Sequence, residues 1–167
     1  MNQLAEELGN LLLQNGLKVT AAESCTGGGV AAAITDVAGS SAWFDAGFVT
    51  YSNQAKTQML QVDSSLFETE GAVSCAVVEA MSLGALIAAN ADLAVAVSGV
   101  AGPGGGSEDK PVGTVWISWR SHEKVVNTRF QFGGDRAEVR QQTVVVALKG
   151  MIDLVTTGRV SDATLSL

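Results

Sequence analysis

Apolar residues recur along the chain with two periods, one helical and one strand-like, and the segments that carry them alternate. From Asn2 to Gln14 the leucines stand three or four positions apart, which predicts an amphipathic helix that stops at Asn15-Gly16. A short β-prone run at 17–22 follows, and then an alanine-rich helical run at about 28–35. The first part of the chain is therefore predicted to be helix, strand, helix.

The same alternation continues to the end of the chain. It predicts strands at about 44–51, 93–97, 112–119 and 124–132, and helices at about 53–60, 75–90 and from 135 onward, with one short helix before residue 75. The run 93–97 is apolar throughout, which is typical of a strand buried on both faces. Only the short turn 121–123 separates the last two strands, which indicates a hairpin. We therefore expect an α/β fold: a three-layer α/β/α sandwich with a mixed, mostly parallel sheet of about five strands.

Composition and charge narrow the possible functions. With 167 residues and no linker or repeat, the chain is expected to form a single domain over 1–167, with a frayed tail from about 158. A net charge of −7 without a Lys/Arg run argues against nucleic-acid binding. No apolar run is long enough to span a bilayer and no signal peptide is recognisable, so we expect a cytoplasmic protein with no membrane partner.

Polar or glycine-rich segments follow three of the predicted strands, at 23–28, 51–56 and 98–107. In an open α/β sheet, ligands bind beyond the carboxyl ends of the strands, so these segments are expected on one rim. At 23–28, the first N–H groups of the following helix are expected to point at a bound anion or carbonyl oxygen. The alternative interpretation is a tight turn capped by Ser or Thr.

Several mechanisms are excluded by the residue types. A Ser-His-Asp triad would need His122, the only histidine, which lies in the predicted hairpin turn. The nucleophile elbow G-x-S-x-G fails around Ser24, and the glycine loop lacks the G-K-S/T of a phosphate loop. No His, Cys, Asp or Glu cluster has metal-ligand spacing, and Cys25 lacks the arginine of a cysteine phosphatase loop. A serine or tyrosine hydroxyl that works with a lysine remains.

Lys56 is the lysine that could play this part, because it lies in the first turn of a predicted helix. The helix dipole would lower its pKa by an amount worth only ~0.3–1 kcal/mol. Lowering the pKa from about 10.4 to near 7 requires about 4–5 kcal/mol, so desolvation must supply most of it. A neutral Lys56 can take a proton from Ser41, Ser24 or Tyr51, which suits hydrolysis at a carbonyl. The alternative is an ordinary surface lysine.

The glycine-rich loop and Arg136 are candidates for anion binding. Backbone N–H groups of the loop could form a nest around a phosphate, with Ser107 as a further donor. Alternatively, the loop is only a flexible connection. Arg136, at a predicted helix start, could clamp a phosphate or carboxylate, or it could pair with Asp135 or Glu138 at the surface.

A series of ordered motifs over about residues 4–155 resembles the CinA C-terminal domain family, and most closely its stand-alone bacterial members, the nicotinamide mononucleotide deamidases of PncC type. The motifs are Ala22-Glu23-Ser24-Cys25-Thr26-Gly27-Gly28, Gly39-Ser40-Ser41, Gly47-Phe48-Val49-Thr50-Tyr51-Ser52-Asn53-Gln54-Ala55-Lys56, Gly71-Ala72-Val73-Ser74, Ser98-Gly99-Val100-Ala101-Gly102-Pro103, Gly105-Gly106-Ser107, Lys110-Pro111-Val112-Gly113-Thr114-Val115 and Gly134-Asp135-Arg136.

The resemblance implies hydrolysis of the carboxamide of nicotinamide mononucleotide to nicotinate mononucleotide and ammonia, in pyridine nucleotide recycling. It implies a small-molecule nucleotide substrate, no metal or organic cofactor, and a homodimer. The catalytic residues implied are Ser24, Ser41, Tyr51 and Lys56. The substrate-binding residues expected are Thr26, Gly27, Gly28, Ser98, Gly102, Gly105, Gly106, Ser107 and, on the phosphate side, Arg136.

Within this group we expect Ser41 to be the nucleophile or to position the attacking water, with Lys56 as its base. Tyr51 and Ser24 would orient the amide and donate to the developing oxyanion. The roles of the two serines are exchangeable, because the sequence gives residue types and their order but not distances. Two other functions stay open: an inactive member that only binds a nucleotide, and an amidohydrolase of a non-nucleotide amide, for which Arg136 would be dispensable.

Overall fold

Five strands form one sheet, in the order β2-β1-β3-β4-β5, in a computed structural model that describes residues 1–165. The strands are β1 (Val19–Glu23), β2 (Phe44–Val49), β3 (Leu93–Gly99), β4 (Thr114–Ser121) and β5 (Val125–Gln131). The first three strands pair in parallel, whereas β4 is antiparallel to both β3 and β5. Four of the five strands thus run in one direction, and the predicted mixed, mostly parallel sheet is confirmed.

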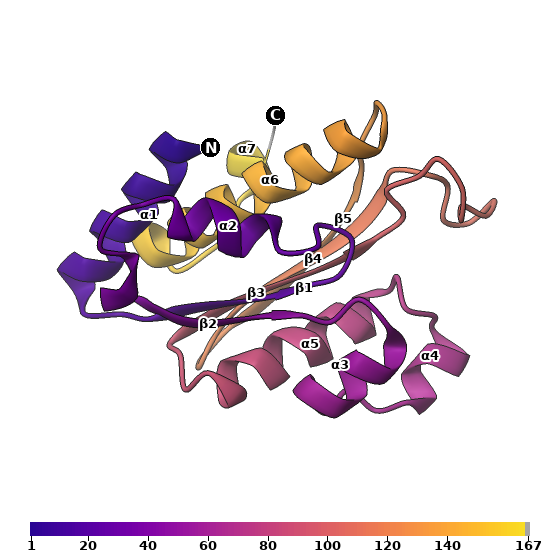
Figure 1. The fold of residues 1–167 in the computed structure, drawn as a ribbon, viewed down its shortest axis with the longest axis horizontal. Coiled ribbons are helices and arrows are strands. Elements are labelled where there is room, and N and C mark those ends of the chain that lie inside the picture. Colours follow the sequence, from indigo (N-terminus) through magenta and orange to yellow (C-terminus); the bar gives the residue numbers. More distant parts are fainter. Residues whose placement is uncertain (166–167) are drawn as a thin grey trace.

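Helices cover both faces of this sheet, so the predicted three-layer sandwich is also confirmed (Figure 1). Helices α1, α2, α6 and α7 lie on one face, and α3, α4 and α5 lie on the other. The helices are α1 (Asn2–Asn15), α2 (Gly29–Thr35), α3 (Asn53–Leu60), α4 (Ser65–Thr69), α5 (Cys75–Ala88), α6 (Arg136–Thr157) and α7 (Asp162–Leu165), and a 3-10 turn, η1, spans Ser40–Ala42. None of the helices in the described residues combines the length and hydropathy needed to cross a membrane.

The sheet separates two apolar clusters, because side chains along a strand alternate between its faces. Val95 of β3 packs in the cluster under α1, α2 and α6, whereas its neighbour Ala96 packs against α5. Both faces of β3 are therefore buried, as its continuous apolar pattern predicts. In the stretch predicted to be frayed, Leu165 of α7 is buried in the first cluster. Residues 166–167 of that stretch lie outside the described residues.

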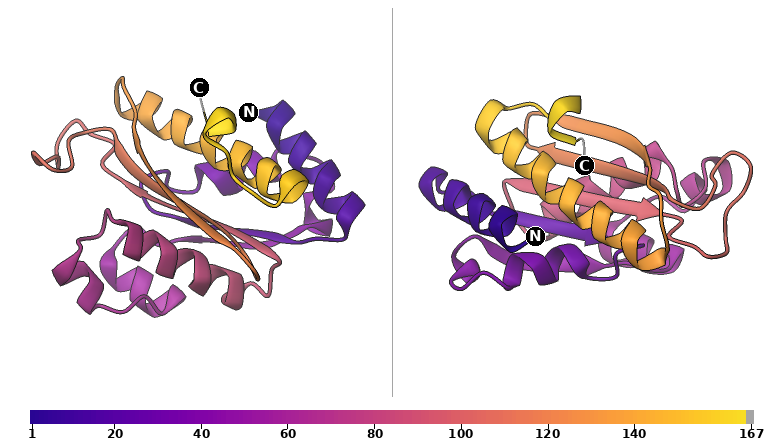
Figure 2. Two further views of the ribbon diagram at one scale, coloured as in Figure 1. Left: turned by 180° about the vertical axis from the view of Figure 1, so that it is seen from behind. Right: turned by 90° about the horizontal axis from the view of Figure 1, so that it is seen from above.

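Three strands end at the same edge of the sheet, and this edge positions the site. Glu23, the last residue of β1, pairs with Val49 of β2 on one side and with Val97 of β3 on the other. The segments that follow β1, β2 and β3 consequently leave the sheet together, as predicted. Figure 2 shows that the loop after β3, residues 100–113, projects well beyond this edge.

Candidate active site

Lys56 and Ser24 contact each other at the shared edge of the sheet. Ser52 caps α3 by accepting a hydrogen bond from the N–H of Ala55, which places Lys56 in the first turn of the helix. The side chain of Lys56 is only 1% exposed, and its Nζ lies 3.1 Å from Ser24 Oγ. It also donates to the carbonyl oxygens of Thr50 at 2.9 Å and Tyr51 at 3.4 Å. The lysine is therefore buried and fixed beside a hydroxyl group.

The surroundings of Lys56 favour its neutral form. Burial lowers its pKa because water no longer solvates the ammonium, while a weaker interaction with Cys25 acts in the opposite direction. Within residues 1–165, no carboxylate forms an ion pair with Lys56. Desolvation is therefore the main cause of the shift, as the sequence-based argument requires. A neutral amine within hydrogen-bonding distance of a serine can accept the hydroxyl proton.

Within this chain Ser41 does not lie beside Lys56, so the role expected for Ser41 stays a prediction. Ser41 belongs to η1, which precedes β2, whereas Lys56 comes after the carboxyl end of the same strand. Because Phe44 at the start of β2 pairs with Val19 at the start of β1, Ser41 lies near the opposite edge of the sheet. Of the two serines considered, Ser24 is the partner of Lys56 in this chain.

The corner 24–28 is organised around the buried carboxylate of Glu23. This carboxylate accepts hydrogen bonds from the hydroxyl of Thr26 and from the N–H groups of Gly28, Val30 and Ala31. Gly28, the N-cap of α2, has φ of 97°, a left-handed conformation that glycine adopts at little cost. The expectation that the first N–H groups of α2 face a ligand is thus wrong, because Glu23 already occupies them. Thr26 and Gly28 support the corner through Glu23.

Glu23 was not predicted as a functional residue, because a single acidic residue at the end of a strand forms no sequence motif that indicates its role. The one signal available was burial, since the preceding run is apolar and strand-like. Gly27 lies at the same corner, with φ of 59°, close to Arg140.

Two arginines of α6 extend over the edge of the sheet. Arg136 donates through Nη1 to the carbonyl oxygen of Gly102 at 2.9 Å, and through Nη2 to the hydroxyl of Tyr51 at 3.2 Å. Arg140, one helical turn later, donates through Nη2 to the carbonyl oxygen of Thr26 at 2.7 Å. Arg136 therefore joins Tyr51 to the glycine loop, as its place among the predicted site residues suggests. Arg140 was missed, although its spacing of four residues from Arg136 puts both on one helix face.

The glycine loop is only partly near the site. Gly102 lies under Arg136, but the stretch beyond it is exposed and projects from the sheet (Figure 2). Ser107 closes this stretch on itself, since its N–H donates to the carbonyl oxygen of Lys110 and its Oγ accepts from the Lys110 N–H. Gly105 and Gly106 belong to the same projecting stretch, so a nest formed by these residues around a substrate phosphate is not present in this conformation. Ser98 is buried, and its hydroxyl donates to the carbonyl oxygen of Ala72.

Other candidate groups lie elsewhere or are inert. His122 is exposed in the β4–β5 turn and lies 4.0 Å from Asp92, which excludes a triad with Ser24. Burial raises the pKa of the Cys25 thiol to about 12, so this group is protonated at neutral pH. Within the described residues, no three His, Cys, Asp or Glu side chains are grouped as metal ligands.

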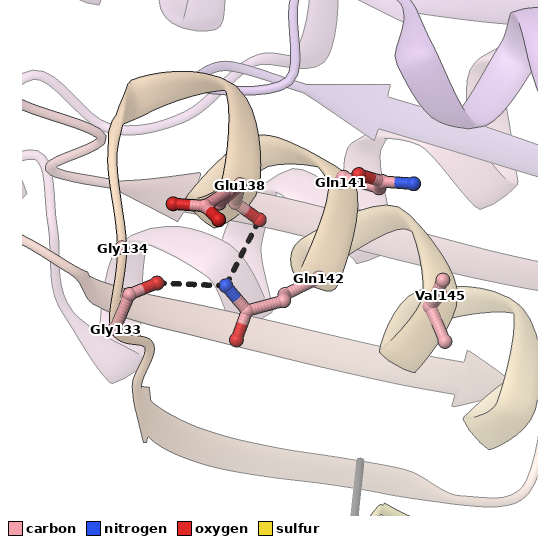
Figure 3. Close-up of a pocket in the computed structure, with 6 residues that line it drawn as sticks. All are labelled: Gly133, Gly134, Glu138, Gln141, Gln142 and Val145. Carbon is pink, nitrogen blue, oxygen red and sulfur yellow. Dashed lines mark hydrogen bonds between the residues drawn. The ribbon is translucent and has the colours of Figure 1, made fainter.

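Two cavities flank the start of α6. One, of about 620 Å³, is lined by Arg136, Arg140, Pro103 and Val112 among others, and Arg140 links it to the corner through its hydrogen bond to Thr26. The other, of about 510 Å³, lies around Gln142, whose amide donates to the carbonyl oxygens of Gly133 and Glu138 (Figure 3). In that second cavity the amide of Gln142 is already bonded to the chain itself. The first cavity is therefore the better candidate for holding part of a substrate.

Comparisons with known proteins place this chain among relatives of known sequence and structure. The sequence model of the CinA C-terminal domain matches residues 1–155. A nicotinamide-nucleotide amidohydrolase PncC from Pseudomonas putida is 59% identical over 90% of this chain and 94% of its own length. The protein of the same name from Escherichia coli K12 is 55% identical over 88% of this chain and 90% of its own. Among solved structures, the competence damage-inducible protein A from Klebsiella pneumoniae superposes with a TM-score of 0.90 at 40% identity, covering 93% of this chain and 97% of that one.

Proposed function

The chain belongs to the CinA C-terminal domain family, and from this premise we infer that it is an amidohydrolase that converts nicotinamide mononucleotide to nicotinate mononucleotide and ammonia. The relatives whose names state this activity on a nicotinamide nucleotide match nearly the whole chain. The single structural observation that supports the chemistry is the contact between Ser24 and the buried Lys56.

In the proposed mechanism Ser24 is the nucleophile and Lys56 is its base. Neutral Lys56 accepts the hydroxyl proton while Ser24 Oγ bonds to the carboxamide carbon and the carbonyl becomes an oxyanion. The tetrahedral intermediate then expels ammonia, which takes the proton from Lys56, and a nicotinoyl ester of Ser24 remains. Water, deprotonated by Lys56, hydrolyses this ester to the carboxylate and regenerates Ser24.

Tyr51 and Arg136 are proposed to position the substrate. Tyr51 is 59% exposed at the rim, and its hydroxyl is oriented by Arg136. A guanidinium suits a phosphate because it offers several N–H donors in one plane. With Arg136 at the wall of the cavity beside α6, the mononucleotide phosphate would lie in that cavity and the carboxamide would lie toward Ser24.

Ammonia release from nicotinamide mononucleotide tests this function directly. The wild-type protein is expected to release one ammonia per nicotinate mononucleotide formed, whereas the Lys56→Met variant releases none above background. Ammonia release from a non-nucleotide amide but not from the mononucleotide would instead support the alternative amidohydrolase. Binding of the mononucleotide without release of ammonia would support the inactive, nucleotide-binding alternative.

Arg136→Ala separates these readings further. A charge-assisted contact to the phosphate is worth about 1.5–3 kcal/mol, so the variant should chiefly raise KM, by roughly 10- to 100-fold. An unchanged KM would favour a substrate without a phosphate.

We also propose that the protein works in the cytoplasm as a homodimer, without nucleic-acid partners and without an added cofactor. The net charge of −7 supports the lack of a nucleic-acid partner. Light scattering coupled to gel filtration would test the dimer.

A further inference from the structure

Arg140 connects the catalytic corner to the cavity beside α6. Its Nη2 donates to the carbonyl oxygen of Thr26, which stands two positions after Ser24. The same side chain lines the cavity of about 620 Å³ together with Arg136. The chemistry proposed above gives Arg140 no role, so the reason for this placement is open.

Stability alone does not account for the position of Arg140. Its Nε is buried and has no hydrogen-bond partner among the described residues, which is unfavourable for folding. The carbonyl oxygen of Thr26 also accepts a hydrogen bond from the N–H of Gly29, at 3.2 Å, and would not be left unpaired without Arg140. Arg140 is therefore not needed to keep the Thr26 carbonyl paired, and its own Nε is left without a partner among the described residues.

The hydrogen-bond donors available to an anion in this cavity are the side chains of the two arginines and few backbone N–H groups. The first N–H groups of α6, from Ala137 and Glu138, already donate to the capping carboxylate of Asp135. A guanidinium carries five N–H donors, and the contact with Thr26 uses only one of those of Arg140. Arg136 and Arg140 are thus the groups through which an anionic group in this cavity would be held.

We propose that Arg140 is a positioning residue that contacts the substrate phosphate and, through its hydrogen bond to Thr26, couples phosphate binding to the position of the Ser24 hydroxyl. This inference rests on the proposed function, because it assumes a phosphorylated substrate. Phosphate binding would hold the guanidinium in place, and the guanidinium would in turn hold the corner that carries Ser24. The binding energy of a remote group would then raise kcat as well as lower KM.

The test compares the wild type with Arg140→Gln, Arg140→Lys and the matched control Arg159→Gln, which removes an exposed arginine after the far end of α6. Calorimetry measures the Kd of ribose 5-phosphate, a probe that has the phosphate but no amide. Ammonia release measures kcat and KM for nicotinamide mononucleotide. Circular dichroism checks that each variant is folded.

Arg140→Gln is expected to weaken ribose 5-phosphate binding by about 10- to 100-fold, the effect of a lost charge-assisted hydrogen bond, and to lower kcat at least about tenfold. Arg140→Lys should recover part of the affinity but not kcat. One ammonium cannot replace the planar guanidinium that hydrogen-bonds both the phosphate and the Thr26 carbonyl oxygen. Arg159→Gln should change neither quantity. If Arg140→Gln does not fold, the split between affinity and kcat in Arg140→Lys decides the question.

Two results would overturn the inference. An unchanged Kd with a lowered kcat would make Arg140 a brace for the corner with no phosphate contact. A weakened Kd with an unchanged kcat would leave a phosphate contact that is not coupled to Ser24. Failure of the proposed function looks different, since the wild type itself would then release no ammonia from the mononucleotide.

Discussion

Replacing Lys56 with methionine should abolish turnover while leaving the protein folded. Methionine has nearly the length of the lysine stem but cannot accept a proton from Ser24, from which Lys56 Nζ is separated by 3.1 Å. A positioned general base contributes about 10²- to 10⁴-fold to a rate, or roughly 2.7–5.4 kcal/mol of barrier. We therefore expect kcat for ammonia release from nicotinamide mononucleotide to fall by at least about 100-fold.

The effect of Lys56→Met on stability should be small and should depend on pH. The substitution leaves the carbonyl oxygens of Thr50 and Tyr51 without this donor, at a cost of about 1–3 kcal/mol for each that stays buried, but it also removes the desolvation penalty that applies wherever Lys56 is protonated. Burial lowers the pKa of Lys56 in the folded state, so the unfolded chain binds more protons between that pKa and about 10.4. Across this window the wild type should gain stability relative to the variant as the pH rises.

Lys18→Met is the matched control for this experiment. Lys18 is an exposed lysine, paired with Asp45 near the start of β1 and away from Ser24. Its replacement should leave kcat within about twofold of the wild-type value. Ser24→Ala should reduce kcat about as far as Lys56→Met, and the double variant no further, since the two groups act as one unit. A folded Lys56→Met protein with kcat within about threefold of wild type would mean that Lys56 is not the base.

Three further predictions concern the corner and the core. Glu23→Gln should destabilise the fold by about 1.5–3 kcal/mol in urea titrations, because the uncharged amide is a weaker acceptor for the start of α2; a stability equal to wild type would mean that Glu23 does not hold the corner. Cys25→Ala should keep kcat within about threefold of wild type, since the thiol with a pKa of about 12 supplies no thiolate, and strong inactivation would reopen a cysteine mechanism. Gly150→Ala should lower the free energy of unfolding by about 1–3 kcal/mol, because the new Cβ would overlap the Trp119 ring. The control Gly104→Ala, where a Cβ meets open space, should stay within about 0.5 kcal/mol of wild type in the same urea titrations.

Local pattern was sufficient to predict most of the fold. The leucine spacing of α1, the apolar run of β3 and the short turn before β5 each depend on neighbouring residues, and all three elements occur within a few positions of their predicted bounds. The strand order was not predicted, because pairing between β1 and β3 joins segments about 70 positions apart and leaves no local signature.

The site was predicted in part, for a comparable reason. Lys56 and Ser24 were expected together because both follow parallel strands, and the shared edge places them in contact. Ser41 was assigned to the same group by the resemblance to the family, which does not say at which edge of the sheet a residue lies. The expected anion site at α2 was wrong because the Glu23 carboxylate already accepts from the first N–H groups of the helix. The sequence pattern is the same whether these N–H groups are free or bonded to a neighbouring carboxylate.

NMR titration of ε-¹⁵N-labelled lysine in the folded protein would show whether Lys56 is held neutral beside Ser24. Lys18, exposed and distant, serves as the internal reference in the same spectra. The Lys56 resonance should titrate well below that of Lys18, and the shift should persist in Ser24→Ala because burial is its main cause. Titration of Lys56 near the ordinary lysine pKa of about 10.4 would contradict the account.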